Sequence, residues 1–334
     1  MSTNNQFQLC LCKAQSLFTR LHPSMQHALL NPYVQTSLAV LLALALVKGL
    51  NGYLSKRVQN NWLRIDKWDP ARELVALTGG CSGIGKKIME DLSRRNVKVV
   101  ILDINEPDFS LPPNVFFYKT DVTSRSTVKQ VASQIRKDHG EPTVLINNAG
   151  VGTMDTILDK PEDQIRLTME VNTLSHFWTV KEFLPSMIQM DHGHIVTVAS
   201  MASFAGIGEI TDYSCSKAAA LAFHEGLSQE VRHWYGSKKV RTSIIHPIWV
   251  RTPLIDAILK AGKKWKQPVL EPEEISAAVV NQIVSGDGGQ VVVPGRYGVA
   301  AMLRGFPNWI QETIRDRLSL DFVMLRELEK QLGK

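Results

Sequence analysis

Acidic residues are absent from the first 65 positions of the chain, which contain six basic ones. The basic residues of this leader are Lys13, Arg20, Lys48, Lys56, Arg57 and Arg64. Because they account for the whole formal charge of +6, the rest of the chain carries 32 basic and 32 acidic residues. A nucleic-acid-binding domain normally concentrates positive charge on its surface, so this balance argues against one. The acid-free leader suits contact with an anionic membrane surface instead.

Cysteine is also scarce, and we find no internal repeat and no low-complexity linker. The four cysteines are Cys10, Cys12, Cys81 and Cys215. Their spacing fits neither a metal site nor a disulfide framework, which agrees with a reducing compartment. With 334 residues, of which 44% are apolar, the chain can form one large α/β domain or two small ones.

One apolar run interrupts the leader: residues 38–47 are ten uninterrupted Leu, Ala and Val residues. Extended to 33–54, the run reaches the ~20 residues that a spanning helix needs only by including polar ends. Spanning the membrane, inserting as a hairpin and lying at the interface are therefore all open. The basic residues after the run outweigh those before it, so the positive-inside rule places the following domain in the cytosol.

Three other interpretations of the leader compete with a membrane anchor. A cleaved secretory signal does not fit, because more than thirty residues precede the apolar core. A mitochondrial presequence fits the lack of acidic residues but not the low arginine content. A buried amphipathic helix that packs on the following domain is the remaining alternative.

The stretch from Gly193 to Ala220 carries three side chains that can run one proton-coupled reaction. Tyr213 and Lys217 are four residues apart in a helix-favouring context, so both should lie on one helical face. The ammonium should then lower the pKa of the tyrosine. Ser200 follows an apolar, β-branched run, and we expect it at the carboxyl end of a buried strand, where its hydroxyl can hold a substrate oxygen. The alternative is an ordinary solvated Tyr–Lys pair, which many long helices contain.

Glycines cluster between a predicted strand, Glu73 to Leu77, and a predicted helix. Gly79, Gly83 and Gly85 would let the backbone approach a pyrophosphate at the positive end of that helix. A second predicted strand ends at Asp103, about twenty residues further along the chain. A carboxylate there can accept hydrogen bonds from the adenosine ribose hydroxyls and repel a 2′-phosphate. We therefore predict a dinucleotide site that prefers NAD(H) to NADP(H).

Predicted strands and helices continue to alternate along the chain. The predicted strands are residues 73–77, 97–102, 115–118, 143–146, 194–199, 240–245 and 289–293. One long helix, from about Pro161 to Met190, carries Asn172. This alternation predicts an α/β fold, a Rossmann-type doubly wound parallel sheet of about seven strands with its ligand-facing residues at the carboxyl edge. Asp121, after the third strand, would meet the adenine amine, and residues 147–150, after the fourth, would border the cofactor.

Residues 70–295 resemble a classical short-chain dehydrogenase/reductase. The resemblance rests on the glycine turn, on the N-N-A-G run of residues 147–150, and on Ser200 standing thirteen positions before Tyr213. It implies a catalytic set of Asn172, Ser200, Tyr213 and Lys217. It implies cofactor contacts from Gly79, Ser82, Gly83, Ile84, Gly85, Asp103, Asp121, Val122, Asn148, Ala149, Gly150, Tyr213, Lys217 and Thr252. No metal ligand is predicted.

Residues 172–185 and 194–202 are similar to the membrane-associated branch of that family, which includes retinol dehydrogenases and 17-beta-hydroxysteroid dehydrogenases. The resemblance implies hydride transfer between NAD(H) and a lipophilic alcohol or carbonyl compound: a retinoid, a steroid or a long-chain lipid. Tyr213 would exchange the proton, Ser200 would orient the oxygen, Lys217 would hold the nicotinamide ribose, and Asn172 would position a relay water. The alternative is a non-catalytic cofactor-binding protein at a membrane or lipid-droplet surface.

The resemblance has one departure, at the sixth predicted strand. Ile248 follows Pro247 where the family usually has glycine, which bears on the local backbone, although Thr252 should still reach the nicotinamide amide. The segment after Thr252 then makes an apolar lid that turns basic at Lys260, Lys263, Lys264 and Lys266. The apolar residues of this lid are Pro253, Leu254, Ile255, Ala257, Ile258 and Leu259. Residues 299–310 have helical spacing and predict a second apolar face near the pocket mouth, or a packing surface or dimer contact.

Three parts of the chain follow from these observations. Residues 1–65 are expected to form a membrane-targeting anchor, 66–295 the dehydrogenase/reductase domain, and 296–334 an amphipathic helical extension. The resemblance implies attachment to the endoplasmic reticulum or to lipid droplets, with the catalytic domain in the cytosol. The expected partners are a lipophilic substrate and the membrane surface; a homodimer is an open alternative.

Overall fold

The computed structural model describes residue 16 and residues 19–63 and 68–331. Several positions named above lie outside these described residues, namely Cys10, Cys12, Lys13, Arg64 and Asp66. The chain divides into two compact units, Met1–Val58 and Gln59–Lys334, and each is described by itself.

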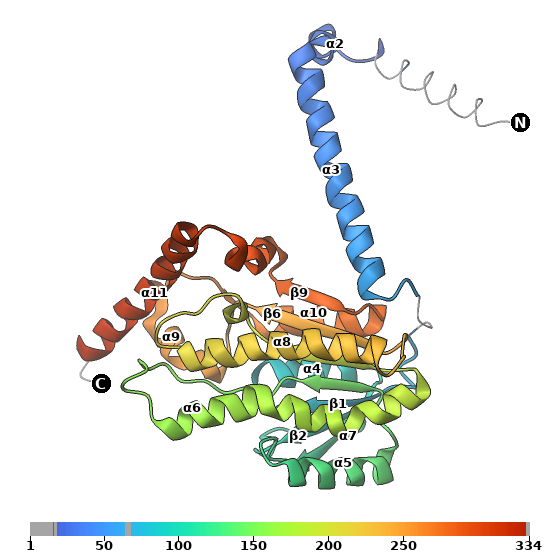
Figure 1. The fold of residues 1–334 in the computed structure, drawn as a ribbon, viewed down its shortest axis with the longest axis vertical. Coiled ribbons are helices and arrows are strands. Elements are labelled where there is room, and N and C mark those ends of the chain that lie inside the picture. The colour runs from blue at the N-terminus through green and yellow to red at the C-terminus, as the bar shows by residue number, and fades with distance from the viewer. Residues whose placement is uncertain (1–15, 17–18, 64–67, 332–334) are drawn as a thin grey trace, which may run out of the picture. The chain divides into compact units, whose positions relative to one another are not determined.

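The first unit contains α2 Pro23–Leu30 and α3 Pro32–Gln59 (Figure 1). The predicted apolar run lies within α3, which is 28 residues long and has no buried residue. An 18-residue window of α3 has a mean hydropathy of 1.7, and among the described residues α3 is the one helix that is both long and apolar enough to cross a membrane. At 1.5 Å per residue its length is about 42 Å, which exceeds the ~30 Å hydrocarbon core of a bilayer.

The second unit is organised around a parallel sheet of seven strands in the order β3-β2-β1-β4-β5-β6-β9. The strands are β1 Leu74–Thr78, β2 Lys98–Asp103, β3 Val115–Lys119, β4 Val144–Asn147, β5 His194–Val198, β6 Arg241–Pro247 and β9 Gly289–Val293. Each predicted strand is present close to its expected bounds, and the predicted doubly wound fold is confirmed. β1, β4 and β5 are buried at every position, as their continuous apolar sequences require in a sheet covered on both faces.

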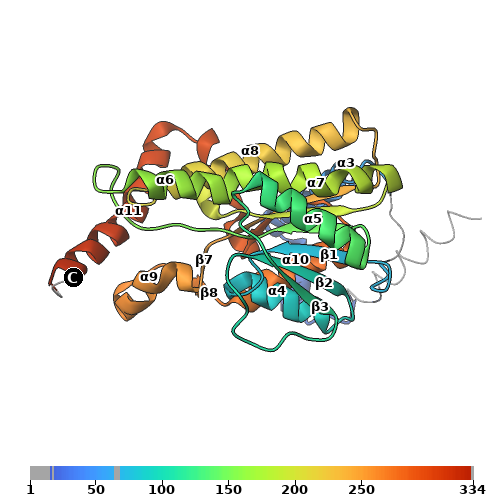
Figure 2. The same ribbon diagram turned by 90° about the horizontal axis from the view of Figure 1, so that it is seen from below.

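Helices separate the strands and cover the sheet. The α-helices of this unit are α4 Gly83–Ser93, α5 Arg125–His139, α6 Glu162–Met169, α7 Ser175–Met190, α8 Thr211–His233, α9 Asp256–Ala261, α10 Pro272–Ser285 and α11 Asn308–Gln331. The turns of 3-10 or π helix are η1 Glu170–Leu174, η2 Met201–Ser203, η3 Pro253–Ile255, η4 Gly262–Lys264 and η5 Gly295–Gly305. Figure 2 shows α5, α7 and α8 on one side of the sheet and α4 on the other.

Alternate residues along each strand face the two sides of the sheet, so the sheet has two hydrophobic cores. Val75 and Leu77 of β1 pack in the core that contains residues of α4 and α10. Leu74 and Ala76 of the same strand pack in the core that contains residues of α5, α7 and α8. One apolar strand therefore contributes side chains to both cores, one on each face of the sheet.

The strand order reverses between β1 and β4. β1 pairs with β2 on one side and with β4 on the other, both in parallel. Connections from these two strands leave toward opposite faces, and ligands of doubly wound sheets bind at such a switch point, beyond the carboxyl ends of the strands. The glycine turn follows β1 and the N-N-A-G run follows β4, so both lie at this point.

A small second sheet supports the predicted lid. β7 Trp249–Val250 pairs in parallel with β8 Val269–Leu270, and η3, α9 and η4 lie between them. The sequence analysis did not predict this sheet. Within the lid, Ile255 and Ile258 are buried whereas Leu254 is exposed, so the apolar residues of the lid divide between the core and the outer surface. Of the lid lysines, the side chain of Lys263 lies outside the described residues.

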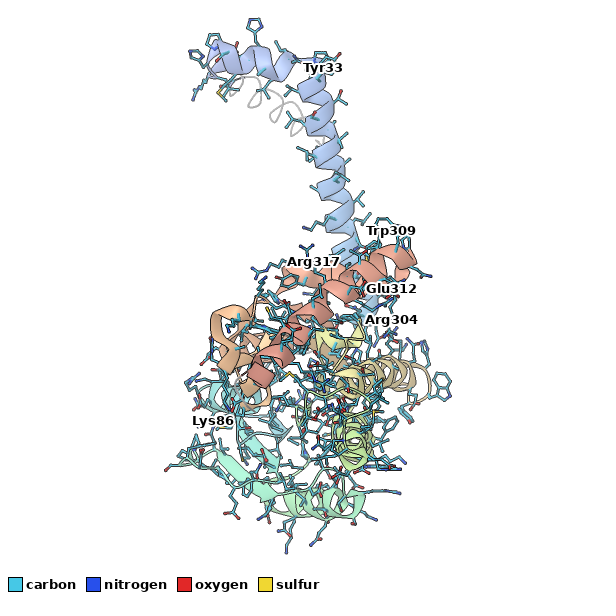
Figure 3. All side chains as sticks on the ribbon, turned by 90° about the vertical axis from the view of Figure 1, so that its left-hand side faces the viewer. Tyr33, Lys86, Arg304, Trp309, Glu312 and Arg317 are labelled. Carbon is cyan, nitrogen blue, oxygen red and sulfur yellow. The ribbon has the colours of Figure 1, made fainter. Side chains whose placement is uncertain are left out.

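The predicted helical face at 299–310 is not one helix. Gly305 and Pro307 interrupt it, so the segment forms η5 followed by the start of α11. Trp309 at the start of α11 is exposed (Figure 3), as are Val299 and Met302, whereas Leu303 is buried.

Candidate active site

Tyr213 and Lys217 lie in the first turns of α8, as their spacing predicted. The Lys217 Nζ atom is 5.6 Å from the centroid of the Tyr213 ring. It also donates a hydrogen bond of 3.1 Å to the carbonyl oxygen of Val198, the last residue of β5. Lys217 is only 3% exposed, so the pair is not the solvated surface pair of the alternative interpretation.

Ser200 lies just beyond the carboxyl end of β5 and begins the η2 turn. Its hydroxyl accepts a hydrogen bond from the Ala202 amide at 3.1 Å. Ser203, at the end of η2, donates its hydroxyl to the carbonyl oxygen of Lys217 at 2.8 Å. The turn that carries the serine is therefore bonded directly to the helix that carries the tyrosine and the lysine.

The pKa of Tyr213 moves in the direction opposite to the one expected from Lys217. Burial raises the pKa of Tyr213 to about 12, and a hydrogen bond with Ser200 offsets only part of this rise. Burial lowers the pKa of Lys217 to about 8. The loss of hydration therefore dominates, and Tyr213 is protonated at neutral pH. In this state the tyrosine is a proton donor.

Asn172 lies in η1, a single π-helical turn between α6 and α7. Its side-chain amide donates to the Val151 carbonyl oxygen at 2.8 Å and to the Ser216 hydroxyl at 3.0 Å, and it accepts from the Val151 amide at 2.9 Å. One buried side chain thus fixes the segment after the N-N-A-G run to α8. Turns of π helix inside α-helices are frequent at functional sites.

The glycine turn has the backbone geometry that a dinucleotide cradle requires. Gly79 and Gly83 have φ angles of +66° and +50°, which side-chain-bearing residues rarely adopt. A Cβ at Gly85 would lie 1.9 Å from the Gly79 carbonyl oxygen, so no side chain fits there. Asn148 donates its amide to the carbonyl oxygens of Thr78 and Gly79, at 3.1 and 2.9 Å. The residues present therefore fit a pyrophosphate at the start of α4.

The other predicted cofactor residues surround this turn. Ser82 is the exposed residue before α4, and the partly buried Ile84 packs on the core below it. Val122 is buried just beyond β3, and the Ala149 amide donates to the Thr78 hydroxyl at 3.1 Å.

Two close approaches hold the site together, one between the cofactor side and the catalytic side and one within the cofactor side. A Cβ at Gly150 would lie 3.4 Å from the Asn172 side chain and 3.6 Å from Lys217 Nζ. A Cβ at Gly83 would lie 3.0 Å from the Thr252 side chain. The structure therefore brings the predicted catalytic and cofactor residues into one continuous region.

Asp103 ends β2 beside the glycine turn. Its Oδ2 accepts from the Cys81 amide and its Oδ1 from the Asn105 amide, each at 3.0 Å. Asp121 beyond β3 accepts from the Thr123 amide at 2.9 Å. Both carboxylates are thus held at the carboxyl edge of the sheet.

Two lysines of α4 also stand near this edge. Lys87 pairs with Glu90 at 2.9 Å and with Glu273 at 3.1 Å. The Lys86 ammonium lies 4.0 Å from the centroid of the Phe109 ring. Both lysines therefore already have partners within the protein.

The departure at Ile248 leaves the backbone regular. Ile248 is not among the residues with positive φ, and its amide donates to the Val293 carbonyl oxygen at 3.1 Å. Its side chain packs on the core beneath α4 and α10. The position therefore does not need glycine in this chain.

Sequence reasoning missed two groups that hold the predicted catalytic residues. His246 of β6 donates its Nδ1 to the Ser200 carbonyl oxygen at 3.0 Å, and burial lowers the pKa of His246 to about 4. Lys160 pairs with Asp212, the neighbour of Tyr213, at 2.6 Å, and both side chains are almost fully buried. Strand pairing and loop packing create these contacts, and no local motif marks them.

A cavity of about 280 Å³ lies next to the segment that packs on Tyr213. Gly152 lines it, and a Cβ at Gly152 would lie 2.9 Å from the Tyr213 ring. Met154, Leu254 and Ala257 add apolar surface. The cavity therefore extends from Gly152, beside the Tyr213 ring, toward the lid.

Comparisons with known proteins agree with this site. Residues 73–262 match the family described as short chain dehydrogenase. Estradiol 17-beta-dehydrogenase 11 of Rattus norvegicus is 31% identical over 85% of this chain and 95% of its own length. Epidermal retinol dehydrogenase 2 of Homo sapiens is 32% identical over 64% of this chain and 72% of its own. Dehydrogenase RED2 of Cochliobolus heterostrophus is 45% identical over 60% of this chain and 76% of its own.

Solved structures share the fold. The ligand-free aldohexose dehydrogenase of Thermoplasma acidophilum matches with a TM-score of 0.60 and 24% identity, over 68% of this chain and 94% of that one. The 3-ketoacyl-(acyl-carrier-protein) reductase of Brucella melitensis, complexed with NADH, matches with a TM-score of 0.61 and 18% identity, over 68% of this chain and 98% of that one. With the family match spanning more than half of the chain, this protein belongs to the short-chain dehydrogenase/reductase family and is an NAD(P)-dependent oxidoreductase.

Proposed function

We propose that this enzyme transfers hydride between NAD(H) and a lipophilic alcohol or its carbonyl partner. The observation that carries the proposal is the convergence of Ser200, Tyr213 and Lys217 beside a glycine cradle, with a cavity whose lining residue Gly152 lies next to the Tyr213 ring. The bound nicotinamide supplies or accepts the hydride. Tyr213 exchanges the proton on the substrate oxygen, Ser200 orients that oxygen, and the Lys217 ammonium holds the nicotinamide ribose.

The lipophilic class is supported by the lid and by the names of relatives. Met154, Leu254 and Ala257 offer apolar contact along the cavity. Two relatives are named for estradiol and for retinol. Burial of apolar area contributes ~25 cal/mol per Å², so such walls favour hydrocarbon-rich ligands. A retinoid and a steroid are the leading candidates, ahead of a long-chain lipid.

A substrate panel tests the class. Absorbance at 340 nm, recorded with membrane fractions, should show turnover of retinol, a hydroxysteroid or 3-ketosphinganine well above that of short water-soluble alcohols. Efficient turnover confined to small polar alcohols would contradict the lipophilic class. The absence of turnover with every compound, in a protein that still binds NAD(H), would favour a non-catalytic cofactor-binding protein.

We also propose that α3 anchors the enzyme to the endoplasmic reticulum or to lipid droplets, with the catalytic domain in the cytosol. The length and hydropathy of α3 support an anchor, and Lys56 and Arg57 in its last turn support the orientation. A soluble form should be cut after Val58 and not after Asn60. Asn60 is buried and its side chain bonds the backbone of Gly288, at 2.8 Å from the Gly288 amide.

Removal of residues 1–58 is expected to release soluble protein that binds NAD(H) as the full chain does. Removal of residues 1–60 should also release it, but with a lower melting temperature, because the buried Gly288 amide loses its partner at a cost of about 1–3 kcal/mol. Sedimentation and thermal unfolding measure both effects. If the full chain remains in a high-speed supernatant at moderate salt, α3 is not a hydrophobic anchor.

A further inference from the structure

The C-terminal helix α11 forms one side of the cavity beside Tyr213. Leu325 and Arg326 of this helix line the cavity together with Gly152 and Leu254. Leu325 is buried in the same hydrophobic cluster against which Tyr213 packs. Gly152, which lies next to the Tyr213 ring, and the C-terminal helix therefore border the same space, although more than one hundred residues separate Tyr213 from Leu325 in the sequence.

Two kinds of contact fix α11 to the segment that carries the lid. The Phe322 ring is buried, and its centroid lies 5.6 Å from that of Trp249 and 5.4 Å from that of Trp265. Trp249 donates its Nε1 to Gln267 Oε1 at 2.7 Å, and Gln267 donates its Nε2 to Asp321 Oδ2 at 2.9 Å. An aromatic cluster and a chain of hydrogen bonds thus hold α11 in a fixed position relative to the lid.

Arg326 ties the same helix to two other loops. One terminal nitrogen of its guanidinium lies 2.5 Å from Asp159 Oδ2, and the other lies 3.8 Å from Glu209 Oε1. Asp159 belongs to the segment that follows the N-N-A-G run, and Glu209 to the segment between η2 and α8. A single side chain therefore bridges both loops that lead into the cavity.

The charges around the cavity disfavour an anionic substrate. Asp155, Glu209 and Asp256 line it, and Arg326 is the one cation among the described lining residues. That cation is already paired with Asp159 and Glu209. A carboxylate or phosphate on the far end of a substrate would therefore meet like charge at close range.

We propose that α11 is the wall against which the far end of a bulky, uncharged substrate packs, and that Arg326 is the positioning residue that holds this wall in place. The proposal rests on the oxidoreductase function proposed above and defines its substrate further. A small alcohol that fills only the space beside Tyr213 does not reach α11. The effect of Arg326 should therefore depend on substrate size.

The test compares Arg326→Gln with Arg315→Gln in the full-length protein. Arg315 is a matched control, because it lies on the same helix, pairs with Glu312 at 2.7 Å and does not line the cavity. Arg326→Gln should raise the KM of a bulky lipophilic alcohol such as retinol up to about fivefold, the most expected for a partly exposed ion pair, and leave kcat nearly unchanged. The KM of cyclohexanol should stay the same in both variants.

Two further measurements make the test specific. Asp159→Asn removes the nearer of the two partners of Arg326, so the double variant should be no worse than Arg326→Gln alone. Tryptophan fluorescence can follow binding of the bulky alcohol without turnover, because Trp249 and Trp265 contact Phe322. In Arg326→Gln, the dissociation constant measured in this way should rise by the same factor as KM. Equal losses for both alcohols, or unchanged binding of the bulky one, would overturn the proposal. Wild-type protein that binds but oxidises neither alcohol would instead refute the proposed function.

Discussion

Replacement of Tyr213 by Phe is expected to lower kcat about a thousandfold and to leave cofactor affinity within a few-fold. A positioned proton-transfer group typically contributes 10²–10⁴-fold to the rate, and phenylalanine cannot exchange a proton. The ring itself should stay in place, because it packs against Gly152 and against the cluster that contains Leu325. Initial rates at 340 nm and titration of NADH fluorescence measure the two effects separately.

Tyr235→Phe is the matched control for this variant. Tyr235 lies just beyond α8, and its hydroxyl donates to Glu230 at 3.1 Å on the exposed surface. The control should keep wild-type kcat. Lys217→Ala should lose both turnover and cofactor affinity, because the Lys217 ammonium borders both parts of the site. If Tyr213→Phe retained more than a tenth of the wild-type rate, the tyrosine would not be the acid or base.

The pH dependence of the wild-type enzyme follows from the same residue. Because the pKa of Tyr213 is raised to about 12, the protonated form predominates at neutral pH and serves carbonyl reduction. Alcohol oxidation needs the phenolate, so its rate should rise with pH while the reduction rate stays flat through neutrality. With a pKa of about 8, Lys217 has lost half of its charge at that pH, so the ammonium supports the phenolate less and the rise should become shallower. An oxidation rate that falls from pH 7 to pH 8 would contradict this assignment.

Replacement of Asp103 by Ala should move cofactor preference about a hundredfold toward NADP(H), which corresponds to ~2.7 kcal/mol. The wild-type carboxylate stands at the end of β2 beside the glycine turn, where a 2′-phosphate would meet like charge. Lys87 is held by two carboxylates, and the Lys86 ammonium lies over the Phe109 ring. Neither lysine is therefore free to bind a 2′-phosphate and offset its repulsion by Asp103. The ratio of kcat/KM for NAD(H) to that for NADP(H) measures the change.

Glu106→Gln is the control for the charge itself. Glu106 lies three residues after Asp103 and is exposed, with Lys119 3.6 Å away. It removes the same charge without touching the strand end, so its cofactor ratio should stay near the wild-type value. Wild-type efficiency with NADP(H) equal to that with NAD(H) would refute the preference for NAD(H).

Local sequence determined the frame of the site. The strand, glycine turn and helix around Gly79 and Gly83 were predictable because positive φ angles and a close backbone approach leave glycine as nearly the only choice. The spacing of Tyr213 and Lys217 was predictable because a helix places residues four apart on one face. The continuous apolar strands indicated a sheet covered on both faces, and the alternation of strand and helix indicated that its strands are parallel.

Tertiary structure decided everything that depends on segments distant in sequence. The pKa of Tyr213 rises because burial is a property of the packed site, and the spacing of Lys217 alone gave the wrong direction. The contact of His246 with Ser200 exists only because β5 and β6 pair in one register. The contribution of Arg326 to the cavity depends on how α11 packs on two loops far from it in the chain, and no periodicity within a helix encodes where that helix docks.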